Sequence, residues 1–205
     1  MTKSEKEKFF ILDARSFSVA YPAIWVSNWN DAIPDRGGRH RIPKGALGAD
    51  AGLPSFACTP VLELTPKRRN PPSDIEKIGF QVWFVSDRFK SFAEAQDPGA
   101  FEFVECDSSR LEFNGKKLRY WACGVVRFGS YLNESLSENA NLREEAPGWR
   151  TFTPLSTTRI AVDRAKLGDA RVFSLVECFN TVFCDERFMS ECQRENFRGL
   201  EFTPV

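Results

Sequence analysis

The sequence has few of the residues that catalytic and metal sites use. It contains one histidine, His40, and none of its six cysteines stands in a C-x-x-C pair. Zinc sites combine cysteine and histidine at such spacings, and a serine or cysteine nucleophile normally needs a histidine as its base. The phosphate-binding patterns G-x-x-x-x-G-K-[ST] and G-x-G-x-x-G are also absent. We therefore expect a protein that is not an enzyme and that holds no metal or cofactor.

The sequence also lacks an excess of one charge and a long hydrophobic run. Its 28 lysines and arginines balance 28 aspartates and glutamates, so no net field favours nucleic acid or an anionic membrane as a partner. No apolar stretch approaches the roughly 20 residues that a membrane span needs. The opening residues MTKSEKEKFFIL contain no secretory hydrophobic region. These absences indicate a cytoplasmic protein with neither nucleic acid nor a membrane as its partner.

The cysteines indicate a reducing compartment. Four of the six lie in or beside apolar, strand-like runs, where a thiol serves as a small apolar side chain. We expect all six to be reduced thiols and most of them to be buried. They are Cys58, Cys106, Cys123, Cys178, Cys184 and Cys192.

The most informative feature that is present is a stretch that occurs twice. Residues 80–103, FQVWFVSDRFKSFAEAQDPGAFEF, align without a gap with residues 179–202, FNTVFCDERFMSECQRENFRGLEF. The identical positions pair Phe80 with Phe179, Phe84 with Phe183, Arg88 with Arg187, Phe89 with Phe188, Ser91 with Ser190, Glu102 with Glu201 and Phe103 with Phe202. The match predicts an internal structural repeat, which we call the first unit (80–103) and the second unit (179–202). A shared strand-helix-strand pattern without duplication is the alternative.

Each unit has the pattern of a strand, a helix and a second strand. Gln81 to Val85 is apolar and rich in β-branched and aromatic residues, as a buried strand is. Ser86 in the first unit and Asp185 in the second can each accept a backbone N–H and so begin a helix. Proline and glycine in Asp97-Pro98-Gly99, and Gly199 at the end of residues 196–199, are typical of helix ends. A short strand then closes each unit.

Arg88 and Arg187 occupy the same position in the two predicted helices. Both fall in the first turn, where a cation is unfavourable to the helix dipole. We therefore expect them to play equivalent structural roles, each held by a carboxylate or by strand-end carbonyls of its own unit. Glu102 and Glu201 are the candidate partners.

The remainder of the chain favours the fold class α+β. Asn114-Gly115 is a strong hairpin signal, and a long apolar strand at Leu118–Phe128 follows it. The polar run after that strand, predicted to be partly helical from Asn133 to Glu145, is expected to leave the sheet and to return near Ile160. We expect a single domain over residues 1–205, with a mixed or antiparallel sheet that contains the two related strand-helix-strand units.

The repeat and the C-terminal residues together resemble a family of bacterial immunity proteins. The resemblance lies in Val85-Ser86-Asp87-Arg88-Phe89 after an apolar strand, in Phe101-Glu102-Phe103, in Arg171–Leu175 and in the ending Gly199–Val205. The middle of the chain matches less well, because Asn133 stands where the family carries aspartate. Such proteins accompany polymorphic toxins, including effectors delivered by contact-dependent secretion systems. These motifs carry the fold and no known chemistry, so the resemblance implies a role and no active site.

Two classes of function follow. The resemblance implies an immunity protein that binds a cognate toxin domain and neutralises it by one-to-one blocking. The alternative is a hydrolase or transferase that acts on a small ligand held between the units. A blocker inhibits at one-to-one stoichiometry, whereas an enzyme acts at substoichiometric amounts, so a titration separates the two.

Partner binding is expected on the irregular segments, because the repeated units are committed to internal packing. One candidate is the region Trp25–Arg41, with Trp29 and an arginine-rich loop. The other is the acidic run Glu134–Trp149, whose charge would favour a basic toxin such as a nuclease, although a solvated loop without function has the same pattern. The candidate binding residues are Glu134, Glu138, Glu144, Glu145, Trp149 and Trp29.

Overall fold

The computed structural model describes residues 7–14, 23–32, 53–66, 70–77, 82–146, 149–155 and 157–205. The strands are β1 (Phe9–Ala14), β2 (Ile24–Val26), β3 (Leu62–Leu64), β4 (Ile75–Lys77), β5 (Trp83–Ser86), β6 (Phe101–Glu105), β7 (Glu112–Phe113), β8 (Lys116–Lys117), β9 (Tyr120–Val125), β10 (Phe128–Gly129), β11 (Arg143–Ala146), β12 (Trp149–Thr151), β13 (Val172–Leu175), β14 (Cys178–Asp185) and β15 (Leu200–Pro204). The helices are α1 (Trp29–Ala32), α2 (Asp87–Gln96), α3 (Arg164–Leu167) and α4 (Glu186–Arg194). The predicted fold class, α+β, is confirmed.

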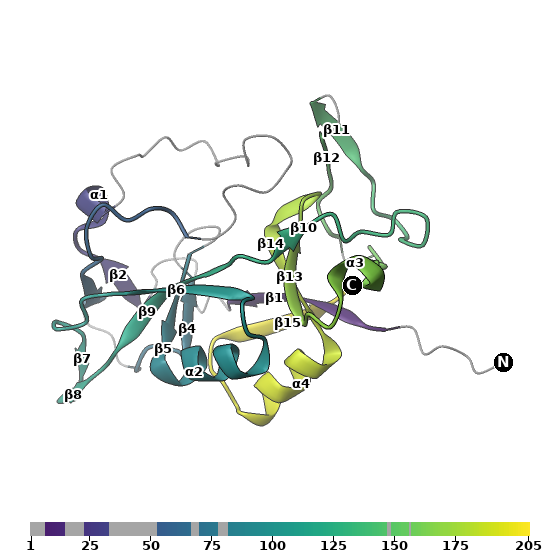
Figure 1. Cartoon of the computed structure of the whole chain (residues 1–205). Helices are drawn as coiled ribbons and strands as arrows, with labels where there is room; N and C mark the ends of the chain where they lie inside the picture. Colours follow the sequence, from purple (N-terminus) through teal and green to yellow (C-terminus); the bar gives the residue numbers. More distant parts are fainter. Residues whose placement is uncertain are drawn as a thin grey trace.

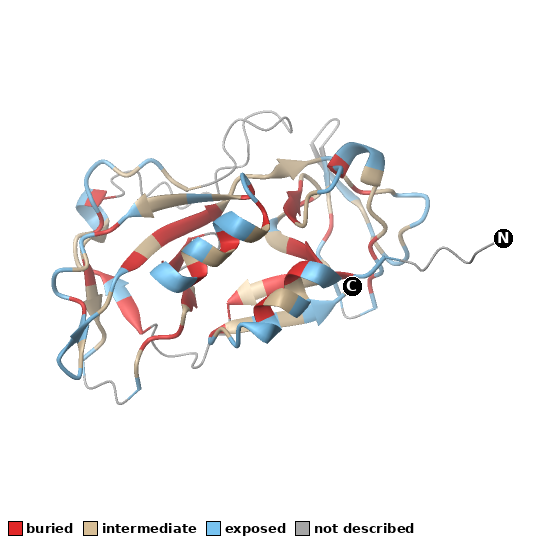
Figure 2. Ribbon diagram, turned by 60° about the horizontal axis from the view of Figure 1, so that its bottom comes forward, coloured by how far each residue is buried: buried red, intermediate tan, exposed pale blue. Residues whose placement is uncertain are grey.

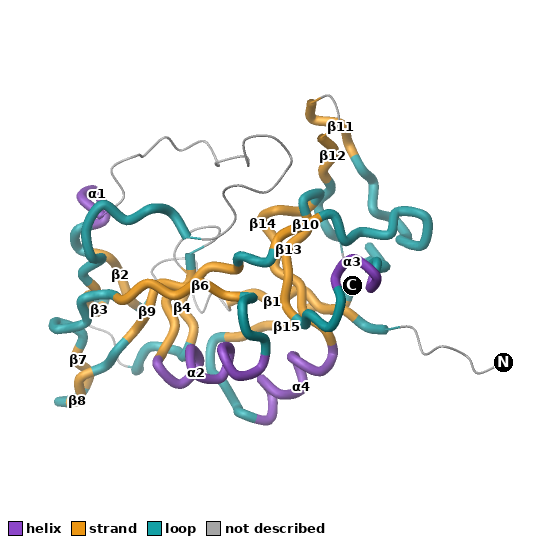
Figure 3. Tube along the Cα trace, viewed as in Figure 1, coloured by secondary structure: helices purple, strands orange, loops and turns teal. Residues whose placement is uncertain are grey.

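Two sheets carry most of the structure (Figure 1). The second-unit sheet has the strand order β10-β13-β14-β1-β15, and it is mixed because β10 and β13 are parallel while the other neighbours are antiparallel. The first-unit sheet is antiparallel, with the order β4-β5-β9-β6. The helices α2 and α4 lie side by side along the same side of the two sheets (Figure 3).

The two sheets share one arrangement of strands. In the first-unit sheet β9 lies between β5 and β6, and in the second-unit sheet β1 lies between β14 and β15. The registers correspond as well: the pairs Val85–Trp121 and Phe101–Val125 take the same positions as Cys184–Phe10 and Leu200–Ala14. The inserted strand comes from later in the chain for the first unit and from its N-terminal part for the second.

Both helices begin at the predicted caps. The Ser86 hydroxyl accepts a hydrogen bond from the backbone N–H of Phe89 at 3.3 Å, and the Asp185 carboxylate accepts one from Phe188 at 2.8 Å. Each cap satisfies an N–H group that has no partner within its own helix. The predicted hairpin turn is also present, because Asn114 and the glycine after it both have positive φ angles between β7 and β8.

The faces of the two sheets that α2 and α4 cover share one aromatic core. Phe92 of α2 lies 5.7 Å from Phe188 of α4 between ring centroids, and Phe89 lies 5.3 Å from Phe197. The buried residues run through the central strands and the inward sides of the helices (Figure 2). A second core lies between the first-unit sheet and the β2–β3 pair, and a third packs against the other side of the second-unit sheet.

A buried carboxylate joins the two sheets. Asp97, at the C-terminal end of α2, is only 5% exposed. It accepts hydrogen bonds from the guanidinium of Arg127 at 2.6 Å and from the backbone N–H groups of Arg171 and Val172 at 2.8 and 2.7 Å. Because Val172 begins β13, this one side chain ties the first unit to the second-unit sheet.

The prediction of one long strand over Leu118–Phe128 is wrong. The chain leaves the first-unit sheet after Val125 and enters the second-unit sheet at Phe128. Arg127, between them, is held by the Asp97 carboxylate and also donates to the carbonyl of Val172 at 3.0 Å. The ion pair between Asp97 and Arg127 therefore divides a mostly apolar run into two strands of different sheets.

The prediction that Arg88 and Arg187 play equivalent roles is also wrong. Arg88 lies 4.3 Å above the ring of Phe197 and donates to the backbone carbonyl of Glu195, both in the second unit. Arg187 is exposed and has no hydrogen bond or ion pair within the described chain. The first-turn arginine thus holds the neighbouring unit in one copy and faces solvent in the other.

Candidate partner-binding surface

A segment that leaves the second-unit sheet and returns to it forms the larger irregular surface of the described chain. We call residues 132–162 the excursion. Its two ends are joined by the isolated bridge between Leu132 and Val162, and Asn133 donates its N–H to the carbonyl of Ala161 at 2.8 Å. A second bridge, between Glu138 and Arg159, joins the two arms of the excursion farther from the sheet. The β11–β12 hairpin forms the tip of the excursion (Figure 1).

The helix predicted from Asn133 to Glu145 does not form. Residues 134–136 are a turn, a bridge follows at Glu138, and β11 begins at Arg143. The Ser137 hydroxyl donates to the carbonyl of Asn133 at 2.7 Å, and Asn139 has φ +57°. Serine and asparagine side chains that bond locally compete with helical hydrogen bonding, which explains the turn.

The acidic side chains of the excursion are matched by arginines. Glu134 forms an ion pair with Arg150, and Glu138 approaches Arg159 at 3.7 Å. Glu144 faces Arg150 across the hairpin. The described glutamates Glu134, Glu138 and Glu144 thus lie beside arginines, which weakens their negative field.

Two further candidate residues lie in the hairpin. The backbone of Glu145 belongs to β11 and that of Trp149 begins β12. Their side chains lie outside the described part of the structure, so their roles stay predictions.

Sequence reasoning missed two exposed apolar side chains on the excursion. Leu136 is 68% exposed and Leu155 is 57% exposed, the highest values for large apolar residues in the described chain. Both occur in polar surroundings without helical or strand periodicity, which is the one signal that could have singled them out. Apolar anchors with charged neighbours are the composition that protein interfaces favour.

The other candidate region is described only in part. Trp29 begins α1 and is half-buried. It packs against the second core, which contains the fully buried Leu62 and Phe84. Trp25 of β2 is 42% exposed and presents more of its ring to solvent. The arginine-rich loop at 35–41 lies outside the described residues.

The cysteines are all free, as predicted, and five of the six are buried while Cys58 is exposed. Burial raises the pKa of the Cys106 thiol to about 12 and that of Cys178 to about 11. Desolvation likewise raises the pKa of the thiols of Cys123, Cys184 and Cys192. Thiols that stay protonated are poor nucleophiles and poor metal ligands.

Among the described residues, no group of three or more His, Cys, Asp or Glu side chains is placed to hold a metal ion. Of the helices in the described ranges, none is long and apolar enough to cross a membrane.

Comparison with known proteins identifies a family over nearly the whole chain. Residues 11–205 match the model described as "Immunity protein family (Imm11)". This range includes both units, the excursion and the inserted strand β9. No curated protein matches the sequence.

Proposed function

Because the chain belongs to the immunity protein family Imm11, we propose that it binds a cognate bacterial toxin domain and neutralises it by forming a one-to-one complex. The observation that carries the proposal is the match of residues 11–205 to that family. Family membership supports a toxin partner in general. We further propose that the toxin belongs to a polymorphic toxin system, as an effector delivered by a secretion system, and that the complex forms in the cytoplasm.

The excursion is the surface that we propose for toxin binding. Leu136 and Leu155 supply exposed apolar area that no internal packing requires. The ion pairs of Glu134 and Glu138 with arginines surround it with polar groups of both signs. Burial of exposed leucine is worth about 25 cal/mol per Å² of apolar area, so a few such residues can anchor a complex whose rim supplies specificity.

We propose that this protein acts by blocking and not by catalysis. The alternative, a hydrolase or transferase acting on a small ligand, requires a nucleophile or a general base in a ligand site. The buried thiols are held in the protonated form by desolvation, and a surface-binding inhibitor needs no such group.

A titration tests the function directly. Genes next to the one for this chain are screened for a toxin domain; that domain is held at fixed concentration, its activity is measured, and the present chain is added. A blocker abolishes activity at one equivalent and forms a complex of that stoichiometry on a sizing column. Full protection at a small fraction of an equivalent would instead indicate turnover, and cells that die despite co-expression of the chain would contradict the proposal.

Charge removal tests the surface. Glu134, Glu138, Glu144 and Glu145 are replaced together by glutamine, and the rate of association with the toxin domain is measured at low and moderate salt. Slower and less salt-sensitive association is expected, because complementary charge accelerates encounter. The control changes four exposed glutamates elsewhere, Glu94, Glu105, Glu112 and Glu186. Unchanged binding at both salt concentrations would exclude the acidic side chains of the excursion.

A further inference from the structure

The strand β15 forms an edge of the second-unit sheet. It pairs with β1 alone, and Val205 just after it donates its N–H to the carbonyl of Phe9 at 3.1 Å. Backbone groups of an antiparallel strand alternate between its two sides, so the N–H and C=O groups of Leu200 and Phe202 point away from β1. Within the described chain, neither residue has a hydrogen-bond partner on that outer side.

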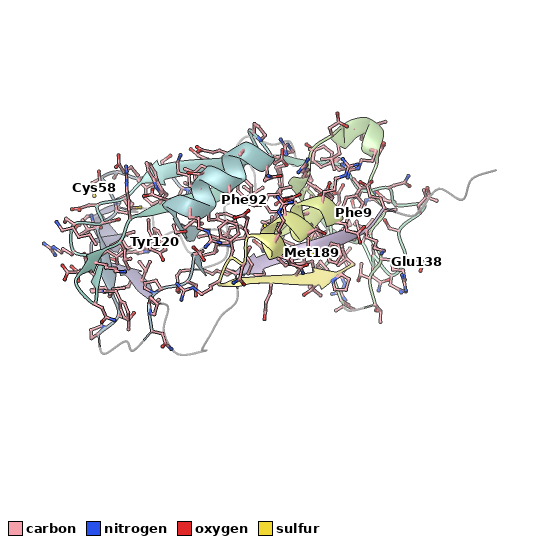
Figure 4. All side chains as sticks on the ribbon, turned by 90° about the horizontal axis from the view of Figure 1, so that it is seen from below. Phe9, Cys58, Phe92, Tyr120, Glu138 and Met189 are labelled. Carbon is pink, nitrogen blue, oxygen red and sulfur yellow. The ribbon has the colours of Figure 1, made fainter. Side chains whose placement is uncertain are left out.

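A groove of about 450 Å³ lies beside this edge, between the C-terminal end of α4 and β15. Figure 4 shows β15 along the margin of the molecule, with α4, labelled at Met189, next to it. Polar atoms make up most of the accessible lining of the groove, which is formed by Gln193, Asn196 and Glu201 together with Cys192, Phe197, Leu200 and Phe202. A free strand edge and a largely polar groove therefore lie next to each other.

Contacts from Arg88 of the first unit and from residues at the start of β4 fix the wall of the groove. The guanidinium of Arg88 lies 4.3 Å above the ring of Phe197. Arg198 donates its N–H to the carboxylate of Asp74 at 3.0 Å, and its carbonyl accepts a hydrogen bond from Ile75 at 3.3 Å. The turn between α4 and β15 is thus held in place, and a preformed groove reduces the ordering free energy that binding requires.

The equivalent edge of the first-unit sheet is different. There β6 carries Phe101 where β15 carries a leucine, and the ammonium of Lys90 lies 5.3 Å above the ring of Phe103. The backbone N–H of Leu53 donates to the carboxylate of Glu102 at 3.2 Å. The chain's own side chains and backbone thus contact β6 and its helix side, whereas a groove remains beside β15.

We propose that an extended segment of the toxin domain adds to β15 as a further strand and places a side chain that can form hydrogen bonds in the groove. Unpaired N–H and C=O groups in a row are satisfied by another extended backbone, and alternate side chains of such a segment face the same side of the sheet. Val205, which follows β15, packs against the same core as Leu142 of the excursion. A segment that runs along β15 is therefore directed toward the excursion. This inference rests on the proposed function, since it assumes a toxin partner.

Amide hydrogen exchange tests the proposal at single residues. It is measured by NMR on the free chain and on its complex with the toxin domain that the titration identifies as the partner. The amides of Leu200 and Phe202 are expected to exchange rapidly in the free chain and about tenfold or more slowly in the complex, because added strand pairing protects them. The equivalent outward amides of β6, at Phe101 and Phe103, are the internal control and are expected to stay unchanged.

A matched pair of variants tests the groove. Gln193→Trp places a large ring on the groove wall, and the toxin is expected to bind about tenfold or more weakly. Arg187→Trp makes the same kind of change on an exposed position of α4 that does not line the groove, and binding is expected to stay unchanged. Circular dichroism and thermal melting of both variants show whether each keeps its fold.

The outcomes separate this inference from the proposed function. A one-to-one complex in which Leu200 and Phe202 exchange as in the free chain would overturn strand addition while leaving toxin blocking intact. Failure of the toxin domain to bind at all would overturn both. Protection of these amides in the free chain that rises with its concentration would assign the edge to a second copy and would also overturn the proposal.

Discussion

The carboxylate of Asp97 lies 2.6 Å from the guanidinium of Arg127, where the chain passes from one sheet to the other. Asp97 ends α2, and Arg127 stands between β9 and β10. The aspartate also accepts the first two backbone N–H groups of the segment that becomes β13. Three stretches distant in sequence thus meet at one buried side chain.

Asp97→Ala is expected to lower the free energy of unfolding by about 3–5 kcal/mol, because it leaves a largely buried arginine and two backbone N–H groups without their acceptor. Urea denaturation measures the change. The control is Glu94→Ala in the same helix, which removes an exposed pair with Lys90 and is expected to change stability by less than about 0.5 kcal/mol. Equal effects of the two substitutions would contradict the role assigned to Asp97.

Gly199 and Gly99 provide a second comparison. Both have positive φ angles, +91° and +79°. A Cβ atom at position 99 would meet no neighbouring atom. Gly99→Ala is therefore expected to lower the free energy of unfolding by about 1–2 kcal/mol, from the left-handed backbone alone. A Cβ atom at position 199 would clash with the carbonyl oxygen of Ile75 and the side chain of Ser73. Gly199→Ala is therefore expected to lower the free energy of unfolding by about 1–3 kcal/mol more than Gly99→Ala does. If urea unfolding showed a smaller decrease in the free energy of unfolding for Gly199→Ala than for Gly99→Ala, the turn between α4 and β15 would be free to move.

Thiol reactivity should single out Cys58. It is the exposed cysteine, whereas the other five are buried. In the native protein we expect one equivalent of a disulfide-exchange reagent such as DTNB to react rapidly, and the remaining thiols to react only as the chain unfolds. Cys58→Ser should abolish the rapid phase. A second rapid equivalent in that variant would show that a core cysteine is accessible.

The pH dependence of stability should reflect Glu177. Burial raises the pKa of this carboxyl, and its Oε2 atom has no hydrogen-bond partner in the described chain. Because the folded state then binds its proton more tightly than the unfolded state, the free energy of unfolding falls as pH rises from about 4.3 through the raised pKa. Glu177→Gln is expected to reduce the slope of the free energy of unfolding against pH in this range. Glu112→Gln, which makes the same change of charge at an exposed position, should leave the slope as it is.

Apolar truncation distinguishes the two candidate binding regions. Leu136→Ser combined with Leu155→Ser is expected to weaken toxin binding about tenfold or more, because it removes two apolar side chains whose burial in the complex would contribute roughly 25 cal/mol per Å². Trp25→Ser removes the exposed tryptophan of the other region and is expected to have little effect. Calorimetric titration measures both. The reverse pattern would place the toxin on the Trp25–Arg41 region.

The elements that could be predicted from the sequence are those that local signals specify. Ser86 and Asp185 each bond an N–H three residues later, and Asn114-Gly115 needs only two positive φ angles, so short-range chemistry decides all three. The matching registers of the two sheets agree with a repeat. That the units arose by duplication and that residues 1–205 form a single domain stay predictions.

The features that the sequence did not reveal depend on distant partners. The chain changes sheets at Arg127 because Asp97, thirty residues earlier, holds it. Arg88 and Arg187 look alike in sequence, but only the first faces an aromatic ring of the other unit. In the candidate surface, the glutamates were visible in the sequence, whereas their pairing with Arg150 and Arg159 depends on how the excursion folds back.

The position of β1 has a consequence for how the protein is made. This strand is near the start of the chain, yet its two neighbours in the sheet are β14 and β15, close to residue 205. At a synthesis rate of about 5–20 residues per second, the two strands that flank β1 are made on the order of ten seconds or more after β1 itself. The second-unit sheet can close only when translation has passed Pro204, so a chain that ends before β15 lacks one of the two neighbours of β1.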